Sequence, residues 1–146
     1  MIGLKDIKKA INDKIKANFS NIKIQSTDIK EGFKRPSFYV KIDNNRDNKF
    51  NPSSKEKTVT IRIYYFPNSK YENEVELLET QDTLENIFLE GLQVNDGFYI
   101  PTLDNELNFT TTDGVLQLAF DLYCIQLLDE EDAEPLDDLE INNRLN

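Results

Sequence analysis

The side chains that enzymes use as nucleophiles, bases and metal ligands are scarce in this sequence. Histidine is absent, and Cys124 is the single cysteine among 146 residues. A nucleophile needs a base within hydrogen-bond reach, and a phosphate-binding loop needs clustered glycines, but the five glycines form no such cluster. Cys124 lies inside an apolar segment, where a buried and unreactive thiol is expected. The sequence therefore predicts no catalytic site and no cofactor site.

Metal binding is equally weakly supported. Without histidine, a structural zinc site would have to be built from carboxylates and one thiol. The acidic run at residues 130–132 could bind a hard cation weakly, but a solvated acidic segment explains it better. A single cysteine also excludes an intrachain disulfide, which is typical of a reducing compartment. We expect no metal.

Lysines near the start of the sequence offer another chemistry, the neutralisation of phosphate. They can line one side of a helix, and they are Lys5, Lys8, Lys9, Lys14 and Lys16. Such contacts give salt-sensitive, sequence-independent binding to nucleic acid, which the net charge of −10 opposes. A solvated helix face explains these lysines adequately. A small nucleic-acid-binding accessory protein therefore stays as an alternative function.

Charge is divided unevenly along the chain. Residues 1–70 hold 16 of the 17 Lys and Arg and 7 of the 27 Asp and Glu, whereas residues 71–146 hold one basic and 20 acidic residues. The two halves carry net charges of +9 and −19. The fold can interleave these charges so that they neutralise each other, or it can turn a basic and an acidic surface in different directions. The second arrangement suits head-to-tail association.

Two segments have the three- and four-residue spacing of apolar side chains that is typical of an amphipathic helix. The first runs from Gly3 to Phe19 and the second from Glu72 to Leu92, with Gly91 at the expected C-cap. The expected buried stripes are Leu4, Ile7, Ala10, Ile11, Ile15 and Phe19 in the first helix and Val75, Leu78, Leu84, Ile87 and Phe88 in the second.

The remaining apolar segments alternate with a period of two, as strands do. Strands are predicted at residues 22–27, 37–43 and 57–67, and hairpins at residues 92–101 and 107–128, the last turning at Asp113-Gly114. The polar residues 43–55 are expected to form a long mobile loop at the tip of a hairpin. Together these segments predict an α+β fold, with a mostly antiparallel sheet of five to six strands packed against two helices.

One domain is predicted over residues 1–128, followed by an acidic segment at 129–146. That segment is too polar to fold alone, and solvation is its default state. An alternative is ordering on a partner, because Leu136, Leu139 and Leu145 recur at near-helical intervals. The longest apolar-rich stretch is interrupted by Gln117, Asp121 and Gln126, so neither a signal peptide nor a membrane span is predicted.

Three short segments give the sequence a resemblance to a known family. They are Lys34-Arg35-Pro36-Ser37-Phe38, Arg62-Ile63-Tyr64-Tyr65-Phe66-Pro67 and Asp113-Gly114-Val115-Leu116-Gln117. In their order along residues 1–128, they resemble the tail terminator (tail completion) proteins of phages and phage-like elements of Gram-positive bacteria. The family motifs do not separate a terminator from a neighbouring neck protein, so a head-to-tail connector is a further alternative.

The resemblance implies a structural, non-enzymatic role in the virion at the junction of tail and neck. The implied assembly is a homohexameric ring, made in the host cytoplasm, that caps the tail tube, stops its polymerisation and provides a surface for neck and head attachment. Its implied partners are other copies of itself, the tail tube protein, the sheath and neck or connector proteins. Phage DNA would pass through the ring without specific binding, and an acidic lumen would repel its phosphates.

A ring needs two unlike, complementary surfaces on each subunit, and the strand at residues 57–67 supplies a candidate for one of them. Val59, Ile61 and Ile63 are expected to pack on the helices, and the opposite face to meet a neighbouring subunit or, as the alternative, to be solvated. The predicted interface residues are Lys34, Arg35, Thr58, Thr60, Arg62, Tyr64 and Phe66. The predicted docking loop, which would reach another ring or remain mobile, contains Asn45, Arg46, Lys49 and Phe50.

Overall fold

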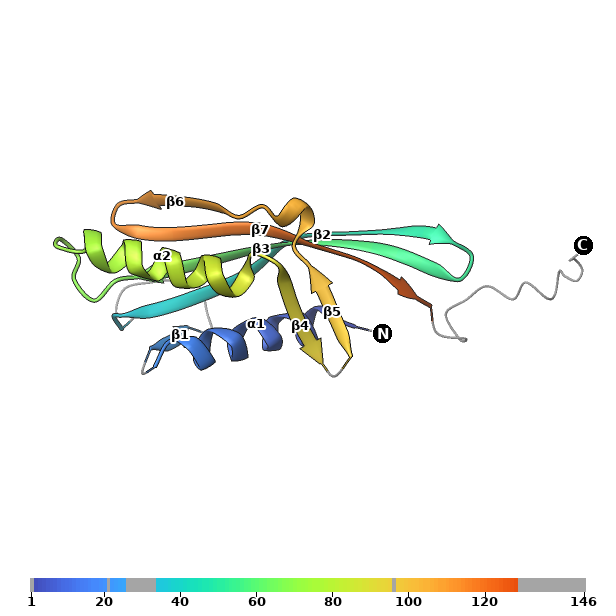
Figure 1. Cartoon of the computed structure of the whole chain (residues 1–146), viewed down its shortest axis with the longest axis horizontal. Helices are drawn as coiled ribbons and strands as arrows, with labels where there is room; N and C mark the ends of the chain where they lie inside the picture. The colour runs from blue at the N-terminus through green and yellow to red at the C-terminus, as the bar shows by residue number, and fades with distance from the viewer. Residues whose placement is uncertain (1, 21, 26–33, 96, 129–146) are drawn as a thin grey trace, which may run out of the picture.

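The computed structural model describes residues 2–20, 22–25, 34–95 and 97–128, and its fold is α+β as predicted (Figure 1). The acidic segment at 129–146 lies outside the described residues. The elements in chain order are α1 (Leu4–Asn18), β1 (Lys23–Gln25), β2 (Ser37–Asn51), β3 (Ser54–Phe66), α2 (Glu74–Phe88), β4 (Gly91–Asn95), β5 (Phe98–Pro101), the short 3-10 helix η1 (Leu103–Asn105), β6 (Asn108–Thr112) and β7 (Val115–Leu127).

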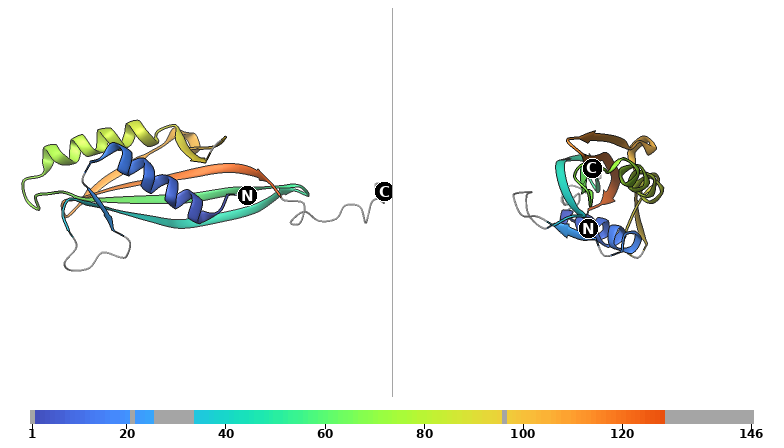
Figure 2. Two further views of the ribbon diagram at one scale, coloured as in Figure 1. Left: turned by 90° about the horizontal axis from the view of Figure 1, so that it is seen from below. Right: turned by 90° about the vertical axis from the view of Figure 1, so that its left-hand side faces the viewer.

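The main sheet has five strands in the order β1-β2-β3-β7-β6. Strand β1 is parallel to β2 and the other neighbours are antiparallel, while β4 and β5 form a separate hairpin. Both helices and this small hairpin lie on one side of the sheet (Figure 2). We call that covered side the inner face and the opposite side the outer face.

Alternation along the two central strands fills the inner face with apolar side chains. On β3, Val59, Ile61 and Ile63 are buried as predicted, together with Tyr65. Register pairs Ile61 with Phe120 and Ile63 with Leu118, so the apolar rows of adjacent strands meet. The core therefore lies between this face and the helices.

Helix α1 forms for the reasons that the sequence suggests. Its three buried residues, Ile7, Ile11 and Ile15, recur every four residues and face the sheet. The Gly3 N–H donates to Asp6 Oδ2 over 2.9 Å, which satisfies one backbone group at the start of the helix. The predicted bounds are correct to within one residue.

Helix α2 differs from the prediction in which face it buries. Leu77, Thr80, Leu84 and Phe88 are buried, whereas Val75 and Leu78 are 67% and 56% exposed. The predicted stripe is therefore wrong at its first two positions, because apolar residues occur on both sides of the first turn and spacing alone does not choose between them.

The glycine after α2 is also not the helix C-cap that the sequence suggests, because Gly91 begins β4 with φ of +151°. A Cβ at this position would collide with the Ile100 carbonyl oxygen and would lie 2.8 Å from the Pro101 Cα. Glycine is required here by the close approach of β5.

The long loop predicted at residues 43–55 is wrong, since these residues continue strands β2 and β3 to a short turn at Pro52 and Ser53. Asn51 Oδ1 accepts hydrogen bonds from the Ser53 N–H at 2.9 Å and the Ser54 hydroxyl at 2.8 Å, which fixes that turn. Strand β7 pairs with β3 as far as Ser54, so the far end of the hairpin gains a third strand. Residues 43–55 are polar apart from Phe50 and Pro52, so the period-two signal is lost there.

Both predicted tight hairpins are confirmed. Asp113 and Gly114, with φ of 54° and 77°, join β6 to β7, and Gly97, with φ of 80°, helps to join β4 to β5. Positive φ at both central residues is what a two-residue hairpin turn requires. The apolar face of β7 is confirmed as well, because Leu116, Leu118, Phe120 and Leu122 are all buried.

Candidate interaction surface

The outer face of the sheet carries four of the predicted interface residues in one row. Thr58, Thr60, Arg62 and Tyr64 alternate along β3, and each is half-buried. Register places Lys41 and Ala119 beside Arg62 on the flanking strands. The structure therefore brings these four residues together on a surface that neither helix covers (Figure 2).

Arg62 has a charge partner within its own chain. Its Nε donates to Asp43 Oδ2 over 2.6 Å. This hydrogen bond holds the pKa of the Asp43 carboxyl below its usual value and raises the pKa of Arg62. The pair orients the guanidinium on the outer face, so Arg62 is a positioned donor rather than a free cation.

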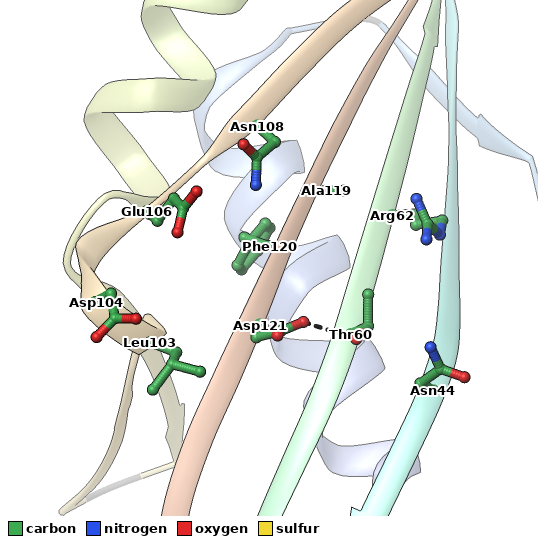
Figure 3. Close-up of a pocket in the computed structure, with 10 residues that line it drawn as sticks. All are labelled: Asn44, Thr60, Arg62, Leu103, Asp104, Glu106, Asn108, Ala119, Phe120 and Asp121. Carbon is green, nitrogen blue, oxygen red and sulfur yellow. Dashed lines mark hydrogen bonds between the residues drawn. The ribbon is translucent and has the colours of Figure 1, made fainter.

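Neighbouring polar side chains on this face are also paired. The Thr60 hydroxyl donates to Asp121 Oδ1 over 2.6 Å, as Figure 3 shows. The Tyr123 hydroxyl donates to Glu56 Oε2 over 2.6 Å, and this bond raises the pKa of Tyr123. These cross-strand pairs hold a mixed polar and aromatic surface in fixed geometry.

A hollow of about 290 Å³ opens beside this row, between the strands and the segment around η1 (Figure 3). Its charged lining side chains are Arg62, Asp104, Glu106 and Asp121. Among the described residues, no group of three or more His, Cys, Asp or Glu is placed to hold a metal ion. The hollow can receive a polar side chain of a partner.

Three other predicted interface residues lie at the start of β2 and the end of β3. The sequence pattern places Phe66 on the outer face with Arg62, but its side chain is only 4% exposed. The Arg35 guanidinium lies 5.9 Å from the Phe66 ring centroid, and Arg35 Nη1 donates to the Pro67 carbonyl over 3.2 Å. Phe66 is thus covered within the single chain, whereas Lys34 is exposed.

The predicted docking residues Asn45, Arg46, Lys49 and Phe50 are all exposed, but they belong to strand β2 rather than to a loop. They lie in a three-stranded projection that we call the arm, made of residues 45–57 and 123–127. Figure 1 shows the arm extending past both helices at the end of the molecule opposite the start of α2.

Polar contacts stabilise the inner face of the arm. Lys57 is buried there, with its Nζ 3.3 Å from Asp47 Oδ1 and 3.4 Å from Asn45 Oδ1. Cys124 is buried as predicted, and burial raises the pKa of its thiol. These contacts add to the strand pairing of the arm.

Comparison with known proteins assigns the chain to a family. A family model described as phage tail terminator protein matches residues 6–134. The chain belongs to the phage tail terminator family. Its members are structural proteins of the phage tail, so this terminator is a tail-related structural component of the virion. In the described part of the chain, no helix is long and apolar enough to cross a membrane.

Other comparisons add little to this assignment. Eleven chains of solved structures match the terminator significantly. One of them is 16% identical, and the match covers 89% of the terminator and 100% of the solved chain. Its TM-score of 0.37 is too low to support an argument. No curated protein matches the chain significantly.

The terminator also has a surface that the sequence pattern misses, the outward side of α2. Tyr71, Val75 and Leu78 are exposed there at spacings of four and three residues. Helix α2 contains five carboxylates and no basic residue, whereas the outward side of α1 is rich in lysine. The sequence does contain a signal for this second surface, because α2 has more apolar residues than one buried stripe can hold.

Three of the ion pairs among the described residues lie within the basic first half of the chain, residues 1–70. Lys9 with Asp13, Lys57 with Asp47, and Arg62 with Asp43 each join two residues of the basic first half. On α2, four acidic side chains are exposed (Glu74, Glu79, Asp82 and Glu85), whereas Glu76 accepts a hydrogen bond from the Tyr65 hydroxyl. This arrangement favours the second of the two interpretations of the charge division.

Proposed function

We propose that this tail terminator assembles into a ring, six-membered as the family resemblance implies, that caps the tail tube and stops its polymerisation. The observation that carries the proposal is the outer face, which is ordered by its own side-chain pairs while neither α1 nor α2 packs on it. A mixed polar and aromatic surface of this kind is typical of an interface that is solvated before assembly.

A ring of identical subunits is built from heterologous contacts, in which two different surfaces of each copy meet. The outer face, with Thr58, Thr60, Arg62 and Tyr64, is one such surface. Helix α2, on the other side of the sheet, is the natural counterpart, because the two lie on opposite sides of one subunit. The exposed carboxylates of α2 would add register to the contact.

The ring leaves two flat surfaces for other tail components. One would contact the tail tube, with sheath around it where the tail has one, and the other would receive neck or connector proteins. DNA would pass through the centre without specific binding, because carboxylates lining the passage repel phosphate. Lys34, which is exposed just before β2, belongs to the proposed contact surface as well.

Native mass spectrometry of the purified protein, with and without isolated tail tubes, tests the ring. We expect a hexamer, and electron microscopy should show it at one end of each tube. A strict monomer that never caps a tube contradicts the proposal. Binding to isolated heads instead of isolated tails would assign the protein as a head-to-tail connector.

A matched pair of variants tests the surface. Tyr64→Ala removes a half-buried ring from the outer face, where it stacks on Tyr39 at 5.9 Å between centroids. We expect this variant to weaken ring formation, and Lys16→Ala, on the exposed side of α1, to leave it unchanged. Equal ring formation by both variants contradicts the assignment of the outer face as the interface.

A further inference from the structure

The outward side of α2 is an apolar strip bordered by acids. Tyr71, Val75 and Leu78 are exposed, Tyr71 by 88%, and they follow one another down one side of the helix and the turn before it. Glu79 and Asp82 continue the same side and are also exposed. An apolar strip rimmed by charge is typical of a surface that meets another protein.

The arm carries apolar side chains of its own at the other end of the molecule. Phe50, Ile125 and Leu127 are exposed, Leu127 by 77%. Ile125 and Leu127 follow Tyr123 on the outer face of β7, since alternate residues of a strand share a face. Four basic and two acidic residues give the arm a net charge of +2, with Arg46 among its exposed cations.

These two surfaces cannot meet within one chain. Figure 1 places the start of α2 at one end of the long axis and the tip of the arm at the other. Each surface is apolar with a charged border, and the signs of the borders are opposite. Complementary patches at opposite ends of one subunit are suited to joining successive copies.

We propose that the arm of one copy lies on the outward face of α2 in the next copy of the ring. This inference rests on the proposed ring and names the contact that closes it. The outer face of the arm, through Ile125 and Leu127, packs on Val75 and Leu78. Arg46 faces the carboxylates that border them.

Charge argues against the symmetric alternatives. Pairing α2 with α2 would bring two acidic surfaces together, and pairing arm with arm would bring two positively charged surfaces together. Like charges placed opposite each other weaken association. The arm of one copy on the helix of another is the pairing in which both the apolar and the charged groups are matched.

Cross-linking tests the pairing directly. The Phe50→Cys and Leu78→Cys variants of the full chain are purified separately, mixed with tail tubes and treated with a short bismaleimide. We expect a cross-linked dimer that contains one copy of each variant, and much less product from either variant alone. The unaltered chain is the control for the buried Cys124. Equal yields from the mixture and from single variants overturn the pairing.

Association measurements give a second test. Leu78→Glu places a charge in the apolar strip, and we expect it to weaken ring assembly at least about tenfold, because the burial of one leucine is worth that much or more. Leu4→Ser, at a less exposed apolar residue of α1, is the control and should assemble normally. Leu78→Glu rings as stable as those of the unaltered chain overturn the inference.

Charge exchange adds specificity to that test. Glu79→Lys alone and Arg46→Glu alone should each weaken assembly, whereas an equimolar mixture of the two should recover a six-membered ring in which the variants alternate, because each arm then meets an opposite charge. A chain that carries both substitutions should recover most of the lost affinity, because every contact again pairs opposite charges. No recovery in the double variant contradicts the proposed pairing.

The outcomes separate this inference from the proposed function. Rings that form and cap tubes, but give no mixed cross-link and tolerate Leu78→Glu, overturn the arm contact and leave the terminator ring intact. A chain that forms no ring under any condition overturns both.

Discussion

Helices α1 and α2 are both 15 residues long and pack on the same face of the same sheet, yet their outward sides differ. The outward side of α1 is lysine-rich, with Lys9 paired to Asp13 over 2.8 Å, and resembles the ordinary surface of a soluble protein. The outward side of α2 combines exposed Val75 and Leu78 with carboxylates.

This difference shows that packing on the core does not determine what a helix presents to its surroundings. Each helix buries side chains of similar kind, isoleucines in α1 and leucine and phenylalanine in α2. Helix α2 retains more apolar surface after folding, with Val75 and Leu78 67% and 56% exposed against 37% for Leu4 of α1. Such a strip of exposed apolar side chains is typical of an interaction surface. We therefore consider α1 a solvated helix and α2 a contact element.

The largest expected effect separates the two sides of α2. Leu84 is fully buried, and Leu84→Ala should lower the free energy of unfolding by about 2–5 kcal/mol through lost burial and a cavity. Leu78→Ala should change it by less than about 0.5 kcal/mol. Urea unfolding of the dilute, unassembled chain measures both. Similar losses in the two variants would mean that α2 does not have an inner and an outward side.

A smaller effect is expected where the helices join their neighbours. Gly91→Ala, just after α2, forces a Cβ against the β5 backbone at positive φ and should cost about 1–3 kcal/mol. Gly3→Ala, just before α1, meets only Asp6 Oδ2 at 3.7 Å and should cost less than about 1 kcal/mol. Thermal unfolding compares them, and an equal loss would remove the distinction.

The next effect concerns the bond that ties α2 to the sheet. The Tyr65 hydroxyl donates to Glu76 Oε2 over 2.6 Å, and Tyr65→Phe should cost about 1–2 kcal/mol at neutral pH. Burial, and then the bond to Glu76, raise the pKa of Tyr65 above its ordinary value of 10.0. Since the folded state holds this proton more tightly, the stabilisation is fully present below about pH 10 and declines above it.

Urea unfolding of Tyr65→Phe across the alkaline range checks the sign. The variant should lose stability less steeply than the unaltered chain above about pH 10. Tyr71→Phe, which alters an almost fully exposed phenol, is the matched control and should follow the unaltered chain. A Tyr65→Phe profile parallel to that of the unaltered chain would contradict the assigned pKa direction.

The smallest effect belongs to the outward side of α1. Lys9 and Asp13 are both well exposed, so Lys9→Ala should change stability by less than about 0.5 kcal/mol and leave ring assembly unaltered. Added salt should remove even that difference. A clear loss of assembly in Lys9→Ala would show that α1 is a contact element too, and the contrast between the helices would fail.

Much of the fold could be predicted from local patterns. The spacing of Ile7, Ile11 and Ile15 determines α1, and the alternation from Val59 to Ile63 determines β3, because each pattern has one face to bury. Asp113 and Gly114 predict the last hairpin through the positive φ that its turn requires. In these segments, local preference and tertiary packing agree.

The errors arise where one segment has two acceptable faces or none. In α2, apolar residues on both sides of the first turn leave the rotation of the helix undecided until Tyr65 and Glu76 meet. Residues 43–55 show no apolar alternation, and pairing with β7, distant in sequence, is what extends β3 to Ser54. The alternation of residues along β3 is enough to predict the outer face. The covering of Phe66 by Arg35 could not be predicted in this way, because it depends on a tertiary contact.

The order of strands in the sheet determines when this protein can fold during its synthesis. Strand β7, the last in the chain among the described residues, lies between β3 and β6, and it pairs Tyr65 with Leu116 and Ser54 with Leu127. The central ladder therefore cannot close until β7 has left the ribosome. With contacts of such high order, folding should be slow, and the nascent β3 should stay exposed to chaperones until β7 emerges.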